Sequence, residues 1–78
     1  MTAQETALRH QQILRRILTT LQVDSGLADH VGKLSVQYAG GGIVVEGNLP
    51  SHHLRGRIVP MIRRAGVLSQ VDNRVAVG

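Results

Sequence analysis

Glycine and proline divide this chain of 78 residues into short segments, and each segment carries the hydrophobic period of one secondary-structure element. A triple glycine, Gly40-Gly41-Gly42, separates two stretches in which apolar and polar residues alternate. Pro50-Ser51 precedes a helical pattern, and Gly66 follows it. Alternation with a period of two indicates a half-buried strand, whereas spacings of three and four residues indicate an amphipathic helix. The punctuation therefore predicts the order helix, strand, strand, helix, strand.

The first predicted helix covers residues 3–21. Its apolar stripe recurs every three or four residues and consists of Ala3, Ala7, His10, Ile13, Leu14, Ile17, Leu18 and Leu21. His10 lies on this stripe near the start of the helix, where we expect a partly covered side chain and not a metal ligand. Leu27 and Val31 then predict a short helical turn within residues 22–32 that covers one end of the core.

The two predicted strands on either side of the triple glycine form a hairpin. The apolar residues that point to one side are Leu34, Val36 and Tyr38, then Ile43, Val45 and Leu49. Glycines that cradle a phosphate lie between a strand and the start of a helix, whereas these lie between two strands. The triple glycine therefore predicts a turn with positive φ. Gly47 within the second strand predicts a bulge or the close approach of another backbone.

The second predicted helix begins after Ser51, a residue type that caps helix N-termini. Its apolar stripe consists of Leu54, Ile58, Met61, Ile62 and Ala65. Pro60 interrupts this stripe and removes one helical hydrogen bond, which predicts one kinked helix. The alternative is a helix that begins with Pro60 at its first position. Gly66 is expected to end the helix at the position after the C-cap.

The third predicted strand runs from Val67 to Val77, and we expect Asn73 within it to bond neighbouring backbone. Its inward residues are Val71, Val75 and Val77, and its outward residues are Asp72, Arg74 and Ala76. A strand–helix–strand crossover is almost always right-handed, so both helices can cover the same face of the sheet. The prediction is a small α+β domain with the order αββαβ, in which a three-stranded mixed sheet has two helices packed on one face. The other face is left open.

The composition excludes several kinds of protein. Cysteine is absent, so neither disulfides nor thiolate metal sites stabilise the fold, and Tyr38 is the only aromatic residue. The start of the chain lacks the pattern of a secretory signal, and no stretch approaches the ~20 apolar residues of a membrane span. As written, the chain is expected in the cytoplasm, and in the periplasm if it is a piece of a longer exported protein. The net charge of +4, with eight arginines among nine basic residues, favours anionic partners, and a solvated basic surface is the alternative.

The order of these elements and their punctuation resemble the BON domain, the bacterial OsmY and nodulation module. The residues that carry the resemblance are Gly42-Ile43-Val44-Val45-Glu46-Gly47-Asn48-Leu49-Pro50-Ser51 and Gly66-Val67-Leu68-Ser69-Gln70-Val71-Asp72-Asn73-Arg74-Val75. It covers residues 11–78 as one domain and leaves residues 1–10 as an extension that continues into the first helix. Pro60 departs from the pattern, because the family usually has a helix former there. BON domains are also commonly exported and tandem, whereas this is one copy without a signal.

The resemblance implies a non-enzymatic adaptor that contacts anionic phospholipid surfaces, mediates protein assembly, or both. It implies no catalytic residue, cofactor or metal. The basic side chains predicted to contact lipid or a partner are His53, Arg57, Arg64 and Arg16. Assembly, with a second copy or with another protein, would use exposed sheet edges or the open sheet face, which is predicted to present Val44, Glu46, Asp72, Arg74 and Ala76.

Two other functions follow less directly from the residues. Weak binding of nucleic acid is the alternative that the positive charge allows, although such proteins usually stack bases on aromatic side chains. A catalytic or metal site would require His52, His53 and Asp72 to meet in space. Adjacent histidines on a helix point about 100° apart and do not share a metal as an i,i+4 pair does. No metal site is therefore predicted.

Overall fold

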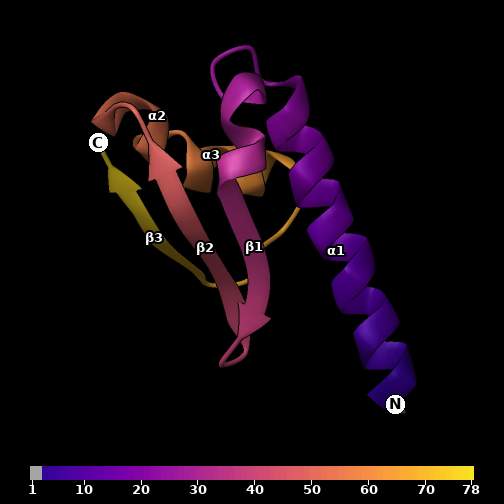
Figure 1. Ribbon diagram of the computed structural model, residues 1–78. Coiled ribbons are helices and arrows are strands. Elements are labelled where there is room, and N and C mark those ends of the chain that lie inside the picture. Colours follow the sequence, from indigo (N-terminus) through magenta and orange to yellow (C-terminus); the bar gives the residue numbers. More distant parts are fainter. Residues whose placement is uncertain (1–2) are drawn as a thin grey trace.

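The computed structural model describes residues 3–78, with side chains from Thr6 onward. Along the chain the elements are α1 (Ala3–Val23), the 3-10 helix η1 (Ala28–Lys33), β1 (Leu34–Ala39), β2 (Gly42–Leu49), α2 (His52–Gly56), α3 (Ile58–Arg64) and β3 (Val71–Val77) (Figure 1). The strands form a mixed sheet in the order β1-β2-β3, in which β1 is antiparallel and β3 parallel to β2. The predicted α+β class and the mixed three-stranded sheet are confirmed.

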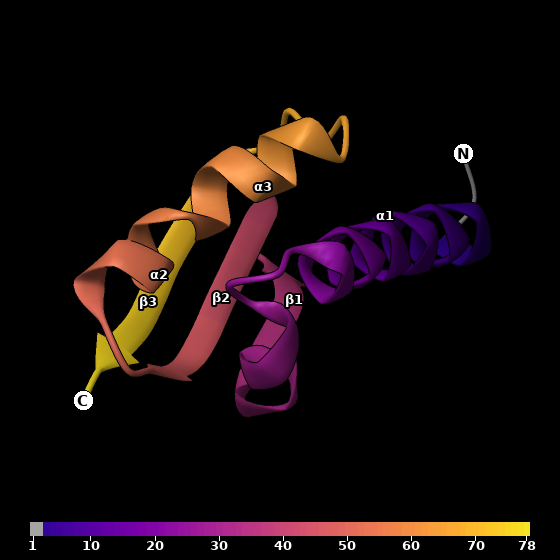
Figure 2. The same ribbon diagram turned by 90° about the horizontal axis from the view of Figure 1, so that it is seen from above.

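The helices pack against the sheet and enclose a core of aliphatic side chains. The largest fully buried ones are Ile17, Leu21, Leu27, Ile43, Val45, Leu49, Ile58 and Ile62. Viewed from above, α2 and α3 lie along one side of the sheet, while α1 runs beside β1, on the side away from β2 (Figure 2). The N-terminal end of α1 extends past the hairpin turn (Figure 1), and the molecule is elongated, at 40 × 23 × 20 Å.

Three glycines of the hairpin occupy positions that a side chain would disturb. Gly40 and Gly41 have φ values of 59° and 81°, as the two central residues of a type I′ turn require. Gly47 has φ 138°, and a Cβ built on it would lie 2.1 Å from the carbonyl oxygen of Lys33. The predicted turn and the predicted close approach at Gly47 are both confirmed.

The second helical segment is divided, which corrects the prediction of one kinked helix. The division falls at Arg57, and Pro60 is the third residue of α3. Because Pro60 has no N–H to donate to the Gly56 carbonyl, helical hydrogen bonding is interrupted there. Helix α3 therefore begins at Ile58, after a break at Arg57. It does not begin at Pro60, and it does not continue α2 without interruption. The predicted cap is confirmed, because the backbone N–H of Leu54 donates to Ser51 Oγ over 3.2 Å.

Two predicted boundaries are wrong. The third strand begins at Val71 and not at Val67, because residues 67–70 form a loop held by Arg63. Arg63 Nη1 donates to the carbonyls of Val67 (2.9 Å) and Ser69 (2.6 Å). Val67 is nevertheless buried, so its apolar character reflects the core and not a strand. Helix α1 ends at Val23, two residues beyond the predicted end at residue 21. Gly66, with φ 85°, follows α3 as predicted.

Candidate functional site

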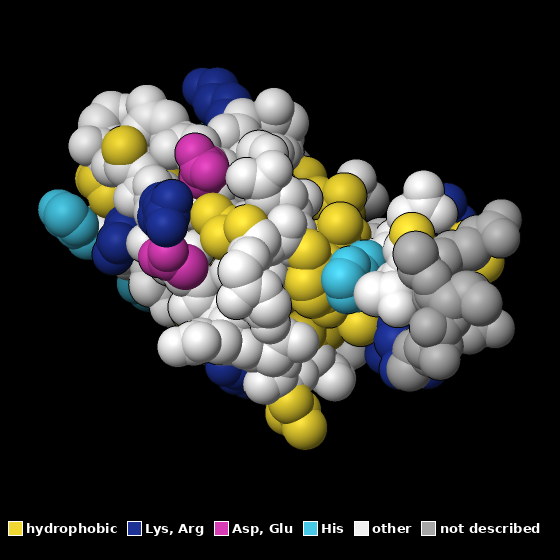
Figure 3. All heavy atoms as spheres, turned by 90° about the horizontal axis from the view of Figure 1, so that it is seen from below, with side chains coloured by type: hydrophobic (Ala, Val, Ile, Leu, Met, Phe, Trp, Pro, Cys, Tyr) yellow, Lys and Arg dark blue, Asp and Glu magenta, His cyan; other side chains and the backbone are white. Residues whose placement is uncertain are grey.

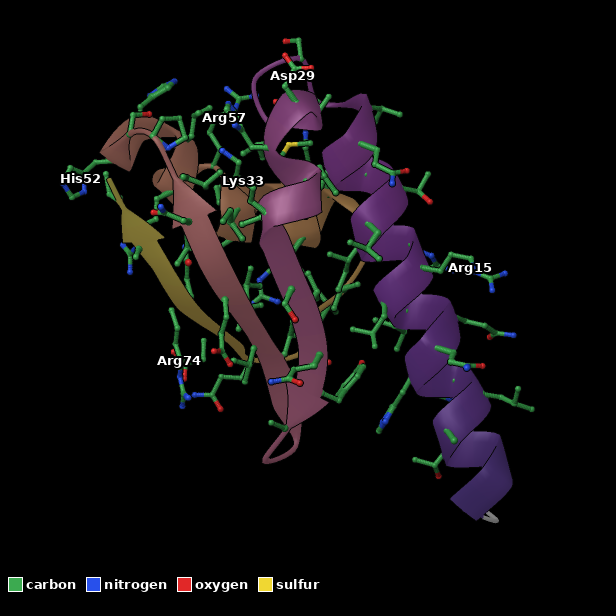
Figure 4. The ribbon with its side chains drawn as sticks, in the orientation of Figure 1. Arg15, Asp29, Lys33, His52, Arg57 and Arg74 are labelled. Atoms are coloured by element: carbon green, nitrogen blue, oxygen red, sulfur yellow. The ribbon has the colours of Figure 1, made fainter. Side chains whose placement is uncertain are left out.

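Arg57, one of the predicted contact residues, is held by an ion pair with Asp24. Asp24 is buried, and its Oδ1 accepts hydrogen bonds from the backbone N–H groups of Gly26 (2.8 Å) and Leu27 (3.2 Å). Its Oδ2 accepts from Arg57 Nη2 over 2.5 Å. The hydrogen bond from Arg57 holds the pKa of Asp24 below its ordinary value, against the opposing effect of burial. In Figure 4, Arg57 lies between α2 and η1, so its guanidinium joins two elements and is only partly available to a ligand.

Arg55 closes the outer edge of β3. Its Nε donates to the carbonyl of Val75 (2.7 Å) and its Nη2 to that of Asn73 (3.0 Å). Asn73 Nδ2 returns a hydrogen bond to the Arg55 carbonyl (3.0 Å), and Asn73 Oδ1 accepts from the N–H of Val75 (3.2 Å). The predicted backbone role of Asn73 is confirmed. At the middle of this edge, the carbonyls of Asn73 and Val75 and the N–H of Val75 already have partners, which opposes the predicted addition of a strand there.

The other predicted contact residues are exposed, and one of them shares a surface hollow with Arg57. Arg57 and Arg64 line a shallow surface hollow of about 230 Å³ together with Gly56, Pro60 and Met61. His53 on α2 and Arg16 on α1 do not line it. The Arg16 guanidinium instead lies near the end of α3, 3.8 Å from the place that a Cβ on Gly66 would occupy. Of the four basic residues, Arg57 and Arg64 are therefore the two that line this hollow.

The open sheet face is a shallow depression of about 480 Å³, with Val44 on the central strand. Val44 lines this depression together with most of the other residues predicted for the face, although it is only 6% exposed. The neighbouring side chains that line the depression include Gln37, Glu46, Asp72 and Arg74. Arg74 Nε donates to Asp72 Oδ2 (2.7 Å), and Gln37 Nε2 donates to Glu46 Oε1 (3.4 Å). The polar groups of this face are thus largely bonded to one another.

The residues considered for catalysis do not assemble a site. His52 and His53 are exposed on α2, and Figure 4 shows His52 pointing away from the body, while Asp72 is bonded to Arg74. Among the described residues, no three His, Asp or Glu side chains come close enough to hold a metal ion. None of the described helices is long and apolar enough to cross a membrane.

A half-buried apolar surface lies between α1 and β1, and the sequence did not predict it. We define the α1–β1 seam as His10, Ile13, Leu14 and Leu18 of α1 with Val36 and Tyr38 of β1. The rings of His10 and Tyr38 stack, with centroids 3.8 Å apart and planes 11° apart. Figure 3, seen from below, shows hydrophobic side chains gathered between the sheet and α1. The stripe of α1 signals its apolar side, but only the tertiary structure reveals which half of that stripe stays uncovered.

Comparison with protein-family models, with curated proteins and with solved structures found no match for this chain.

Proposed function

We propose that this domain is a non-enzymatic binding module that associates with a protein partner through the α1–β1 seam. The observation that supports this most is the uneven cover of α1. Ile17 and Leu21 in its C-terminal half are fully buried, whereas Ile13 and Leu14 are only half-buried. Apolar area left uncovered beside a core is typical of a surface that a partner covers.

Side-chain packing is favoured over the addition of a strand. The outer edge of β3 is occupied by Arg55 and Asn73. The outer edge of β1 faces α1, and the His10–Tyr38 stack bridges the two elements (Figures 1 and 2). An added strand would have to displace that stack. Because the seam offers apolar side chains, a partner that packs its own side chains against them fits better.

Contact with an anionic phospholipid surface is the second candidate, and it is the other function that the resemblance to the BON domain implies. It is supported by Arg15, Arg16 and Arg64, which are exposed and whose guanidinium groups make no hydrogen bond or ion pair within residues 6–78. The commitment of Arg57 to Asp24 removes one of the cations expected for this role. Co-sedimentation with anionic and neutral vesicles at low and physiological salt tests this candidate.

A synthetic amphipathic peptide tests the proposed function. We would titrate a labelled helical peptide, with a leucine stripe flanked by glutamine, and follow its fluorescence anisotropy. Binding to the wild-type chain should weaken at least about tenfold in Leu14→Gln, which changes the seam. The matched control is Leu68→Gln, because Leu68 lies in the loop after α3 and is 86% exposed. Circular dichroism establishes that both variants are folded. Equal affinity for both variants would contradict the proposal.

A further inference from the structure

We infer that the surface hollow beside α2 and α3 binds the phosphate group of a small, soluble phosphate ester. We name it the Arg57–Arg64 hollow. Its volume is about 230 Å³, and its lining consists of Gly56, Arg57, Pro60, Met61 and Arg64. It shares no residue with the α1–β1 seam, so the inference stands apart from the proposed function.

The hollow exists because small side chains lie between two long ones. Arg57 joins α2 to α3 with helical backbone angles (φ −82°, ψ −15°). Seven residues make about two helical turns, so Arg57 and Arg64 project from the same side, about 10 Å apart along the axis. Gly56 has no side chain, and a Cβ built on it would meet nothing within 4 Å. The space between the two arginines is therefore left open.

Arg57 is already oriented for a ligand in this space. Its Nη2 donates to the buried carboxylate of Asp24, which holds the guanidinium between α2 and η1 (Figure 4). The side chain is still 40% exposed, and its Nη1 has no hydrogen-bond partner within residues 6–78. A guanidinium carries five N–H groups, so it can donate to a second acceptor while it stays bonded to Asp24. A side chain held in this way loses little conformational freedom on binding.

Arg64 supplies the second cation. It is exposed, and its guanidinium makes no hydrogen bond or ion pair within residues 6–78. None of the residues that line the hollow is acidic, and Asp24 is not among them. Two guanidinium groups that border one space without a carboxylate between them favour an oxyanion that accepts from both.

A phosphate fits this arrangement better than a carboxylate. The fork of one guanidinium satisfies both oxygens of a carboxylate, so a carboxylate would need only one of the two arginines. A phosphate monoester carries about −1.5 to −2 charges and three acceptor oxygens that point in different directions. It can therefore accept hydrogen bonds from Arg57 and Arg64 at the same time.

The rest of the lining indicates what the phosphate is attached to. Pro60 and Met61 are apolar, and they would contact the carbon atoms of an ester, which inorganic phosphate lacks. A lipid headgroup in a bilayer is a poorer source of the phosphate. Because Arg57 is bonded to Asp24, its guanidinium does not extend freely towards a membrane plane, and the chain has no Trp or Phe to insert there.

Phenyl phosphate is the probe, and the amide resonances of the labelled full chain report where it binds. At constant ionic strength we expect saturable shifts within residues 56–64. Benzoate, which has the same ring but a carboxylate, should bind about tenfold more weakly, because it loses charge-assisted hydrogen bonds to one arginine. Inorganic phosphate should shift the same amides, with lower affinity than phenyl phosphate.

Two pairs of variants locate the site. Arg64→Gln should weaken the binding of phenyl phosphate about tenfold, whereas Arg15→Gln, which removes the same charge from an exposed position of α1, should not weaken it. Gly56→Leu keeps every charge but covers the hollow, and should also weaken binding. Its control is Gly32→Leu, since a Cβ on Gly32 likewise meets nothing within 4 Å. Circular dichroism establishes that all four variants are folded.

Four results would overturn the inference. Equal affinities of Arg64→Gln and Arg15→Gln would show that net charge alone attracts the probe. Undiminished binding to Gly56→Leu would place the probe elsewhere. Benzoate that binds as tightly as phenyl phosphate would exclude a phosphate-specific site. Vesicles of phosphatidylglycerol that bind through Arg64 when phenyl phosphate does not would assign the hollow to a membrane.

The same titration keeps this inference separate from the proposed function. Leu14→Gln, which changes the α1–β1 seam, should bind phenyl phosphate as the wild-type chain does. Gly56→Leu should bind the leucine-stripe peptide as the wild-type chain does. Loss of phenyl phosphate binding in Leu14→Gln would show that the hollow is not an independent site, and would overturn the inference.

Discussion

Asp24 and Arg57 stand 33 positions apart in the sequence, and their ion pair joins the loop after α1 to the junction of α2 and α3. Asp24 also accepts two backbone hydrogen bonds from its own loop, so one buried carboxylate fixes both the loop and its packing. Arg57 is thus a structural residue. A charge reversal at Arg57 would place two carboxylates together, and it would test folding before it tested ligand binding.

Replacing Asp24 by asparagine should destabilise the domain at neutral pH. The pKa of Asp24 is lower in the folded chain than its ordinary value of 3.8, with the hydrogen bond from Arg57 as the largest cause. A depressed pKa contributes stability above pH 3.8 that is lost as the pH falls through the folded value. The difference in melting temperature between wild type and Asp24→Asn should therefore be large at pH 7 and shrink below about pH 3.8. Asp29→Asn, at an exposed position, is the control. Equal melting temperatures at pH 7 would contradict this account.

Gly47→Ala should be among the most damaging single changes to the hairpin. The positive φ and the 2.1 Å approach to the Lys33 carbonyl leave no room for a Cβ. We expect a loss of about 3 kcal/mol or more in the free energy of unfolding, measured by urea denaturation. Gly32→Ala is the matched control, since a Cβ there meets nothing within 4 Å. A similar small effect at both glycines would show that the backbone at Gly47 rearranges without strain.

At the scale of the element, the arginines of α2 and α3 explain why neighbouring segments stay in place. Arg55 ties α2 to β3, and Arg63 holds the loop between α3 and β3. Both bond backbone carbonyls that regular secondary structure does not satisfy. A buried or half-buried carbonyl without a partner is costly, so these side chains make possible a divided helix and an edge strand in a small domain.

Arg55→Met should loosen β3 and expose its edge. The variant keeps the apolar stem but loses the hydrogen bonds to Asn73 and Val75, which should reduce the free energy of unfolding by about 1–3 kcal/mol. An unprotected edge also favours strand pairing between molecules, so we expect more light scattering during storage. Arg64→Met, at an exposed arginine without a hydrogen bond or ion pair within residues 6–78, should do neither. Equal scattering and stability in the two variants would argue against a protective role for Arg55.

The elements were predictable from the sequence where a local pattern decides them. The alternation of apolar and polar residues predicted β1 and β2. The triple glycine predicted a turn with positive φ, which Gly40 and Gly41 adopt, and Ser51 was predicted to cap the second helical segment, as it does. Long-range contacts were not predictable in this way. The sequence presents Arg55 and Arg57 as surface charge, because neither the carbonyls of β3 nor the carboxylate of Asp24 is close to them along the chain. Val67 was assigned to a strand because a buried loop residue and a strand residue share the same apolar character.

The candidate site was predictable only in its components. The stripe of α1 and the partial cover of His10 were predicted, and the His10–Tyr38 stack accords with them. Of the predicted basic contact residues, Arg57 makes an ion pair with Asp24, and this long-range contact could not be read from the sequence. The seam depends on where α1 lies relative to the edge of β1, and no periodicity within one segment specifies that position.

At the scale of the whole molecule, the elongated shape results from a 21-residue helix attached to a compact sheet and two short helices. The C-terminal half of α1 contributes Ile17 and Leu21 to the core, whereas the N-terminal half contacts the body chiefly through half-buried side chains. The apolar side of α1 thus has fully buried positions that stabilise the core and half-buried positions between His10 and Leu18 that remain partly uncovered. We interpret the half-buried positions as the binding surface.

Nuclear magnetic resonance mapping of the uniformly labelled chain, with and without the leucine-stripe peptide flanked by glutamine, tests this central claim most directly. We expect the largest amide shifts in α1 from His10 to Leu18 and in β1 at Val36 and Tyr38, with smaller shifts near Arg9. The open sheet face around Val44 and the hollow beside Arg64 should change little. Shifts concentrated on either of those surfaces, with α1 unchanged, would contradict the assignment of the α1–β1 seam as the binding site.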